Sequence, residues 1–483
     1  MLNDLLKKAK INFYSNKLSS AEGNVRKQWT VLREAADLKK KNKKDILKIE
    51  HGGDILFFKD NPKEVCNIWN NHFISVGSKV AKSCAGEIPN SKAFKFSTKL
   101  KTSTMNNSIF FEPVTSGEIE FHFKSLKTGS SPGWDSYSTE LLKKISPSIS
   151  KPLEHIFNLS LKVGEFPSLL KTSIVIPLHK KGDEKLMTNY RPISLTSNIA
   201  KILEKIVKKR LIYFLNKNKI LSKNQFGFRE NVSTQDAVVN LISTVTEEIN
   251  KKKKPLLILL DIEKAFDSIS HKQLLSRLER IGARGIVFDW FKSYLKDRKQ
   301  IVKIGESKSE ENVSEIGLPQ GTVLSPILFL IYINEICKLS SLGKIFSFAD
   351  DTALLISAES WEEAYKIASR EISAIFYWLR ESELKMNISK TQYMTFSPNI
   401  SGQPSDALKV KIHDNPTNLN LCLENKCNTC QCLQNVPSAK YLGVFVDKYL
   451  KWEKLGGANG LSVPGLTTKV GQTLIDYMYT LSK

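Results

Sequence analysis

Three aspartates in this sequence stand where a strand could deliver a carboxylate to a cleft. Asp261 ends the apolar run PLLILLD, and Asp350 and Asp351 interrupt the run KIFSFADDTALLIS. Carboxylates that converge from separate elements hold two divalent ions about 3.5 to 4 Å apart, an arrangement that catalyses phosphoryl transfer. Such oxygen ligands suit Mg²⁺ better than zinc. The three acids therefore predict a two-ion site for chemistry at phosphate.

The segment around Asp261 has the pattern of a buried strand followed by a helix. Residues 255–260 form a continuous apolar run, as in a strand that is covered on both faces. Apolar residues at helical spacing then continue to Gly282: Phe266, Ile269, Leu274, Leu275 and Leu278. We expect Asp261 at a strand-to-helix junction. The alternative is that Asp261 only caps the start of this helix.

The segment around Asp350 and Asp351 has the pattern of a hairpin. Strand-forming residues flank the Ala-Asp-Asp-Thr centre on both sides. Adjacent aspartates are also common in turns for purely conformational reasons, and this alternative stays open. Two neighbouring carboxylates repel each other, so the pair is costly unless cations are present.

The charge of the chain favours a polyanionic partner. Its 483 residues include 72 Lys and Arg against 49 Asp and Glu, a formal charge of +23. Nucleic acid is the first candidate, through neutralisation of phosphates, and a generally solubilising basic surface is the alternative. The apolar stretches are too short to cross a bilayer. With 7 cysteines and no apolar leader, the sequence predicts an intracellular protein that is not secreted and has no membrane partner.

Composition divides the chain into three parts. Residues 1–100 are lysine-rich and mostly helical in pattern, which predicts a basic N-terminal extension or linker. Residues 101–452 alternate helical patterns with short β-branched runs and contain no fixed repeat, which is typical of an α+β enzyme body. Residues 453–483 contain several glycines that interrupt any helix, so we expect a weakly ordered C-terminal tail.

From about residue 63 to 452 the chain resembles the reverse transcriptases of non-LTR retrotransposons, particularly jockey-like elements. Three central motifs carry this resemblance: LLDIEKAFDSISH (259–271), GLPQGTVLSPILF (317–329) and FADD (348–351). Six further motifs stand in the family's order: SSPGWD (130–135), IVIPLHKKGD (174–183), NYRPISLTS (189–197), QFGFRENVST (225–234), LKMNISKTQYMTF (384–396) and KYLGVFVD (440–447). A chance match to one such string is plausible, but a match to nine in order is not.

The resemblance implies an RNA-directed DNA polymerase. Its fold would be α+β, with the fingers and palm of a right-hand polymerase, an antiparallel palm sheet and a core of about residues 161–447. The helical thumb that follows in the family is expected to be truncated or absent here. The implied partners are an RNA template, a DNA primer and deoxynucleoside triphosphates, with two Mg²⁺ ions that Mn²⁺ could replace. The implied site of action is the nucleus, and the oligomeric state stays open.

The resemblance also assigns the metal ligands. Asp261 and Asp350 match the principal ligands, Asp351 completes the acidic cluster, and Ile262 offers a backbone carbonyl. Elements of this class usually carry an endonuclease before the polymerase, and nothing in residues 1–100 resembles one. Nicking of the target is therefore not expected from this chain.

Five other residues match positions that bind the nucleotide. Phe266 matches a ring beneath the sugar that would clash with a 2′ hydroxyl, although a purely apolar role in the helix is equally consistent with its spacing. Gln320 resembles the residue that contacts the sugar, and Arg191 matches a position that grips the triphosphate. Lys390 matches a lysine near the departing pyrophosphate. Lys181, beside Lys180, is a weaker candidate, because lysines in loops are usually solvated charges.

Two further features concern binding outside the nucleotide site. Arg229 and the pair Ser233-Thr234 have the side chains expected at a template backbone. Four cysteines, Cys422, Cys427, Cys430 and Cys432, lie in one short segment. Their spacing lacks the paired form of most structural zinc sites, which favours a cysteine-rich loop over a zinc site.

Two other functions compete with the leading one. A truncated remnant that binds nucleic acid without catalysis would also keep the charge and the fold. A related palm polymerase, such as a group II intron maturase or an RNA polymerase, is disfavoured by Phe266 and by the jockey-like motifs.

Overall fold

The computed structural model describes residues 2–22, 25–35, 48–85, 105–340, 342–397, 402–413 and 430–450. The predicted C-terminal tail, and with it the question of the thumb, lies outside these residues. So do Cys422 and Cys427. The chain divides into two compact units, residues 1–60 and 61–483.

The smaller unit consists of helices α1 (Leu2–Ser19) and α2 (Val25–Ala35) and an antiparallel hairpin of β1 (Lys48–His51) and β2 (Asp54–Phe57). The sequence placed the end of the N-terminal extension near residue 100, whereas the division between the units falls after Asp60. Helix α3 (Pro62–Ala85) therefore belongs to the larger unit. The reason is tertiary: buried Asn70 donates hydrogen bonds to the carbonyl oxygens of Gln300 (3.3 Å) and Glu310 (2.8 Å).

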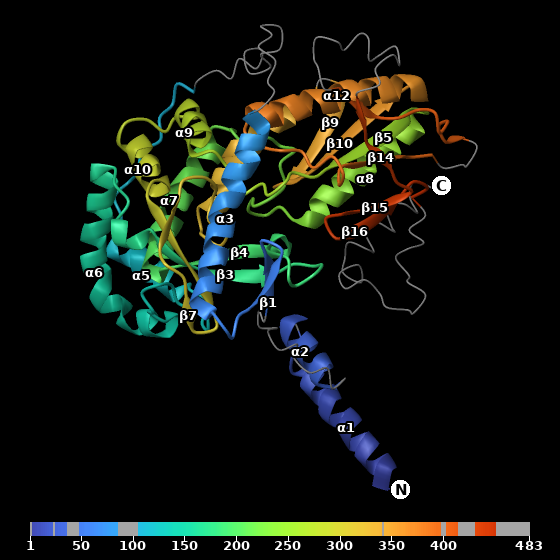
Figure 1. Cartoon of the computed structure of the whole chain (residues 1–483). Coiled ribbons are helices and arrows are strands. Elements are labelled where there is room, and N and C mark those ends of the chain that lie inside the picture. The colour runs from blue at the N-terminus through green and yellow to red at the C-terminus, as the bar shows by residue number, and fades with distance from the viewer. Residues whose placement is uncertain are drawn as a thin grey trace. The chain divides into compact units, whose positions relative to one another are not determined.

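A five-stranded sheet of the larger unit, called here the central sheet, has the order β14-β11-β5-β10-β9. Figure 1 shows it beside the long helix α12 (Trp361–Glu381). The strands of this sheet are β5 (Lys254–Leu260), β9 (Gly343–Phe348), β10 (Asp351–Ala358), β11 (Gln392–Thr395) and β14 (Gln434–Asn435). The central strand β5 is antiparallel to both β10 and β11, and β9 and β10 form a hairpin. Only the short β11–β14 pair is parallel. The buried strand and the hairpin expected from the sequence are both present.

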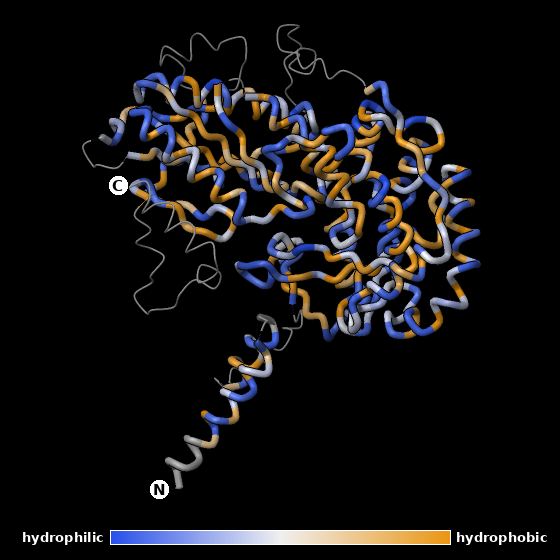
Figure 2. The backbone as a smooth tube through the Cα atoms, turned by 180° about the vertical axis from the view of Figure 1, so that it is seen from behind, coloured by the Kyte–Doolittle hydropathy of each residue, from blue (hydrophilic) through white to orange (hydrophobic). Residues whose placement is uncertain are grey.

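Helices cover both faces of this sheet. Leu256 and Ile258 of β5 pack into the core that includes α12 (Trp361–Glu381), whereas Leu257 faces a second core that includes α8 (Thr234–Asn250). Alternate residues of β5 therefore enter different cores, which explains why its sequence is an unbroken apolar run. Figure 2 shows apolar segments concentrated in the middle of this unit and hydrophilic ones around its rim.

A second sheet, in the order β4-β3-β6-β7 with β8 also paired to β6, carries the motifs that resemble fingers segments. Its strands are β3 (Thr172–His179), β4 (Tyr190–Thr196), β6 (Arg298–Ile304), β7 (Ser307–Lys308) and β8 (Asn312–Ser314). Strands β3 and β4 form an antiparallel hairpin in which Leu178 pairs with Arg191. Strand β6 runs parallel to β3, and helix α3 packs against β6, β7 and β8.

The remaining elements complete the mixed α and β architecture. The helices are α5 (Ser116–Lys124), α6 (Thr139–Val163), α7 (Asn198–Lys217), α9 (His271–Arg280), α10 (Ile286–Leu295) and α11 (Ser325–Ile333), with short helices at Ser168–Leu170, Met187–Asn189 and Asn334–Lys338. The small strand pairs are β12 (Lys411–Ile412) with β13 (Gln431–Cys432), and β15 (Ser438–Tyr441) with β16 (Val444–Asp447). Within the described ranges, no helix is long and apolar enough to span a bilayer.

Candidate active site

The structure brings Asp261, Asp350 and Asp351 together at one end of the central sheet. Leu260, the last residue of β5, pairs with Thr352 of β10, so Asp261 and Asp351 are the next opposed residues in the same antiparallel register. Asp350 lies beside them in the β9–β10 turn. The two segments are separated in the chain, and the sheet register is what joins them.

The closeness of the three acids affects their pKa values. Shielding of its carboxylate from water, followed by the charges of Asp350 and Asp261, raises the pKa of Asp351 to about 6. Burial also raises the pKa of Asp261, and Asp350 adds to this, whereas Lys390 and Lys180 oppose it. Like charges are therefore held together at a cost that bound cations would relieve.

The oxygen donors near Asp261 are of the kind that a divalent cation binds. These donors are the carboxylate oxygens of the three aspartates and the backbone carbonyl of Ile262. Ile262 forms a β-bridge with Met386, but the two hydrogen bonds of this bridge are made by the carbonyl of Asp261 and the N–H of Glu263. The bridge therefore does not use the Ile262 carbonyl, which can serve as a ligand. Among the described residues, no three His, Cys, Asp or Glu side chains already form a cluster that could hold an ion.

Asp261 does not cap a helix. The sequence placed a helix directly after it, but residues 263–268 form turns, and α9 begins at His271 with Ser270 as its N-cap. The physical reason is a tertiary contact: the N–H of Glu263 donates to the carbonyl of Lys385 (2.8 Å), which keeps this segment paired beyond the end of β5. The expected strand-to-helix junction was wrong, and with it the capping alternative.

Basic side chains from two other segments surround the acids. Lys180 and Arg191 lie on the β3–β4 hairpin and its loop, and both interact electrostatically with Asp351. Burial, with Arg191 next, lowers the pKa of Lys180. Lys390 is exposed and interacts with Asp261. Lys181 is also exposed, and no described interaction links it to the acids.

The other two predicted nucleotide residues lie on the turn after Asp261 and on the segment before α11. The partly buried ring of Phe266 stacks on Phe329, with centroids 4.4 Å apart, and meets Phe228 edge-on at 6.2 Å. The side chain of Gln320 donates a hydrogen bond to Asp267 (2.8 Å), the residue after Phe266. The two segments are thus directly connected.

Two polar residues of the motif at 384–396 hold Asp261, and the sequence analysis gave them no role. The N–H of Asn387 donates to the carbonyl of Asp261 (2.8 Å). The hydroxyl oxygen of Thr391 accepts from the N–H of Asp261 (3.2 Å). A hydrogen bond from the Asn387 side chain also opposes the rise in the pKa of Asp261. The sequence did offer one indication of this role, because Asn387 and Thr391 are polar residues within a motif that resembles the family.

Gln225 holds the β9–β10 hairpin turn in place by hydrogen bonds. Its fully buried side-chain oxygen accepts from the N–H groups of Gly227 (2.9 Å) and Ala349 (3.1 Å), and its amide nitrogen donates to the hydroxyl of Ser347 (3.1 Å). Ala349, directly before Asp350, has a φ of 58°. A Cβ at Gly227 would lie 2.3 Å from the Ala349 nitrogen, so glycine is required for this approach. Gln225 thus fixes the turn that presents Asp350.

Replacing Gln225 with Leu is expected to lower the free energy of unfolding by about 3 kcal/mol, because two buried N–H groups would lose their acceptor. Urea unfolding of the purified protein measures this change. Gln235→Leu on the exposed surface of α8 is the matched control and should leave the midpoint unchanged. Equal midpoints for the two variants would contradict the role given to Gln225.

Three residues considered for other sites have partners of their own. Arg229 donates to the carbonyls of Ser222 (3.0 Å) and Gln225 (3.2 Å). Ser233 forms a capping box with Asp236 at the start of α8, so its side chain serves the helix. The sulfur of Cys430 contacts Nδ1 of His413 at 3.2 Å. None of these contacts identifies a template or a metal.

Comparison with known proteins finds relatives that match most of the chain. The family model described as reverse transcriptase (RNA-dependent DNA polymerase) matches residues 178–446 of the 483-residue chain. A probable RNA-directed DNA polymerase from transposon BS of Drosophila melanogaster is 26% identical over 457 residues, covering 93% of this chain and 47% of the relative. The RNA-directed DNA polymerase from mobile element jockey of the same species is 26% identical over 348 residues, covering 70% of this chain and 38% of the relative.

The chain thus spans less than half the length of these two curated relatives. The matched range contains the whole central sheet and all three acids, whereas most of β3 in the second sheet lies before it. The resemblance to jockey-like reverse transcriptases of non-LTR retrotransposons, expected from the order of the motifs, is confirmed. The chain belongs to the reverse transcriptase family.

Proposed function

We propose that this chain is the RNA-directed DNA polymerase of a non-LTR retrotransposon, adding deoxynucleotides to a primer 3′ end and releasing pyrophosphate. The observation that carries the proposal is the meeting of Asp261, Asp350 and Asp351 at one end of the central sheet. Carboxylates from a strand end and a hairpin tip are what two-metal nucleotidyl transfer needs. The family membership of the chain supports the same activity.

The proposed metal ligands are Asp261, Asp350 and Asp351, with the Ile262 carbonyl. Two Mg²⁺ ions bound there, or Mn²⁺ in their place, would lower the pKa of the primer 3′ hydroxyl and neutralise charge on the leaving pyrophosphate. The hydrogen bonds of Asn387, Thr391 and Gln225 hold the acids in place beforehand.

The basic residues are suited to the triphosphate. Arg191 can bind two phosphate oxygens through its planar guanidinium, and it is near enough to the acids to interact electrostatically with Asp351. Lys390 can neutralise the charge of the departing pyrophosphate, and Lys180 and Lys181 extend the positive field along the β3–β4 loop. Phe266 would exclude a 2′ hydroxyl, and Gln320 would contact the sugar of the same nucleotide.

The two sheets support a division into palm and fingers. The central sheet with its acids is the proposed palm, and the sheet of β3, β4 and β6 with its cations is the proposed fingers. The charge of +23 supports an RNA template and a DNA primer as partners. Nuclear action, where the primer and target DNA would be found, is part of this proposal.

Primer extension tests the activity. The purified chain should extend oligo(dT) on poly(rA) with dTTP and Mg²⁺, and EDTA should abolish the product. Binding of the same hybrid is measured in parallel by fluorescence anisotropy. Binding without extension would identify a nucleic-acid-binding remnant instead. Extension that prefers ribonucleotides would point to a different class of palm polymerase.

A further inference from the structure

The segment before α11 is docked onto the turn that follows Asp261. The N–H of Leu318 donates to the carbonyl of Phe266 (2.9 Å), and the N–H of Gly317 donates to the carbonyl of Ile269 (2.8 Å). Nε2 of His271 lies 2.8 Å from the carbonyl oxygen of Gly317. These contacts fix the backbone of this segment two residues before Gln320.

Gln320 is held from the opposite side by strand β4. The N–H of Ser194 donates to the carbonyl of Gln320 (2.7 Å). Gly321 has a φ of +118°, and a Cβ there would lie 2.7 Å from the carbonyl oxygen of Ser194. Ser194 lies on the same strand as Arg191. The backbone of Gln320 is thus pinned between the proposed palm and the proposed fingers.

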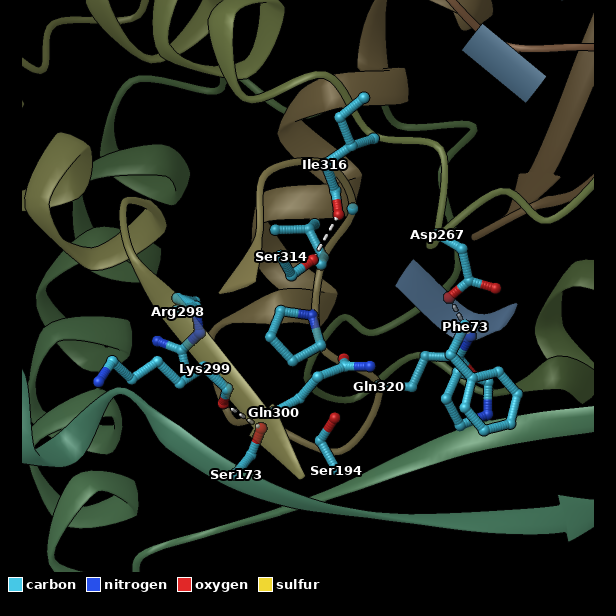
Figure 3. Close-up of a pocket in the computed structure, with 14 residues that line it drawn as sticks. Phe73, Ser173, Ser194, Asp267, Arg298, Lys299, Gln300, Ser314, Ile316 and Gln320 are labelled. Carbon is cyan, nitrogen blue, oxygen red and sulfur yellow. Dashed lines mark hydrogen bonds between the residues drawn. The ribbon is translucent and has the colours of Figure 1, made fainter. Parts of the chain in front are cut away.

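The side chain of Gln320 has one described protein partner, the carboxylate of Asp267 (Figure 3). An ionised carboxylate only accepts hydrogen bonds, so the amide nitrogen of Gln320 must face Asp267 and its oxygen must face away. Burial raises the pKa of Asp267, whereas Gln320, Lys264 and Arg191 all oppose that rise. The contact therefore sets which end of the amide is available to another molecule.

The side chain of Gln320 could adopt another position if its hydrogen bond to Asp267 were lost. Both residues line a cavity of about 40 Å³, together with Ser173, Ser194 and Arg298 (Figure 3). A side chain released from Asp267 could turn into this polar space and satisfy its amide there. The backbone contacts fix the position of Gln320 but leave its side-chain torsions free, so that Asp267 is the group that selects one rotamer.

We propose that Asp267 is a positioning residue for nucleotide binding, which holds the Gln320 amide in the orientation that receives the incoming deoxynucleoside triphosphate. The inference rests on the proposed polymerase function. Asp267 itself touches neither nucleotide nor metal; it acts through Gln320. Its loss should therefore weaken nucleotide binding more than it slows the chemical step.

A double-mutant cycle of Asp267→Ala and Gln320→Ala tests this, with kcat and KM for dTTP measured on poly(rA)/oligo(dT). Asp267→Ala should raise KM about tenfold with a smaller change in kcat, as expected for the loss of a charge-assisted hydrogen bond. In the Gln320→Ala background the same substitution should change KM by less than about twofold. Asp267→Ser takes the place of Asp267→Ala if the alanine variant does not fold.

The conservative variant separates the hydrogen bond from the charge. Asp267→Asn keeps an acceptor for the Gln320 amide and should retain a KM within about threefold of wild type. Additive effects in the cycle, or an Asn variant as impaired as the Ala variant, would overturn the inference while wild-type extension still supports the proposed function. A wild-type protein that incorporates no nucleotide would refute the proposed function and, with it, the inference.

Discussion

Replacing Asp350 with Asn is expected to reduce RNA-templated primer extension by about a thousandfold or more, because a metal-held charge worth several kcal/mol would be lost at the reacting phosphate. The side chain keeps its size, and the hairpin turn is held by Gln225 through Ala349 and not through Asp350 itself. Binding of the template–primer hybrid should therefore stay within about threefold of wild type, because phosphate contacts supply most of that affinity. Single-turnover extension and anisotropy measure the two quantities.

Glu306→Gln is the matched control for this prediction. It removes one carboxylate charge from a side chain that is 97% exposed and is paired with Lys303. The control should extend primers at the wild-type rate. Substantial extension by Asp350→Asn would remove this residue from the catalytic centre. Equal losses in both variants would show that the effect is one of net charge.

Replacing Phe266 with Val is expected to increase incorporation of ribonucleotides relative to deoxynucleotides by about a hundredfold, the upper range for steric discrimination in a pocket. The aromatic contacts with Phe329 and Phe228 hold the ring in one orientation, which a steric barrier to a 2′ hydroxyl requires. The ratio of kcat/KM for UTP and dTTP on poly(rA) measures the selectivity.

Phe121→Val, on the exposed face of α5, is the control for ring removal, since its side chain is 67% exposed. It should leave the UTP to dTTP ratio unchanged. The competing role for Phe266, a purely apolar residue packed on Phe329, makes a different prediction. In that case Phe266→Val would lower the free energy of unfolding but leave the ratio at its wild-type value.

Local sequence patterns were sufficient for the elements that deliver the acids. The run 255–260 is apolar throughout because its two faces enter two cores, and the Ala-Asp-Asp-Thr centre sits at the hairpin tip. The order of the motifs then indicated that Asp261, Asp350 and Asp351, among the many aspartates of the chain, form one site. The register that opposes Asp261 to Asp351 follows from pairing β5 with β10, which no local pattern specifies.

The features that the sequence analysis missed depend on contacts between distant segments. Gln225 reaches Ala349 across 124 residues, and Gln320 reaches Asp267 across 53. The apolar spacing after Asp261 also suggested a helix, but pairing of Glu263 with Lys385 competes with helix formation there. Likewise, the sequence of α3 suggested part of a basic extension. In the structure, however, Asn70 of α3 donates hydrogen bonds to β6 and to the loop before β8. Such tertiary contacts override local propensity.

The most direct test is a crystal structure of the chain with template, primer and a non-hydrolysable deoxynucleoside triphosphate in Mn²⁺, using anomalous scattering to locate the ions. We expect two manganese peaks about 3.5 to 4 Å apart at the carboxylates of Asp261, Asp350 and Asp351. Peaks located elsewhere, or acids that remain without an ion while the nucleotide is bound, would contradict the account.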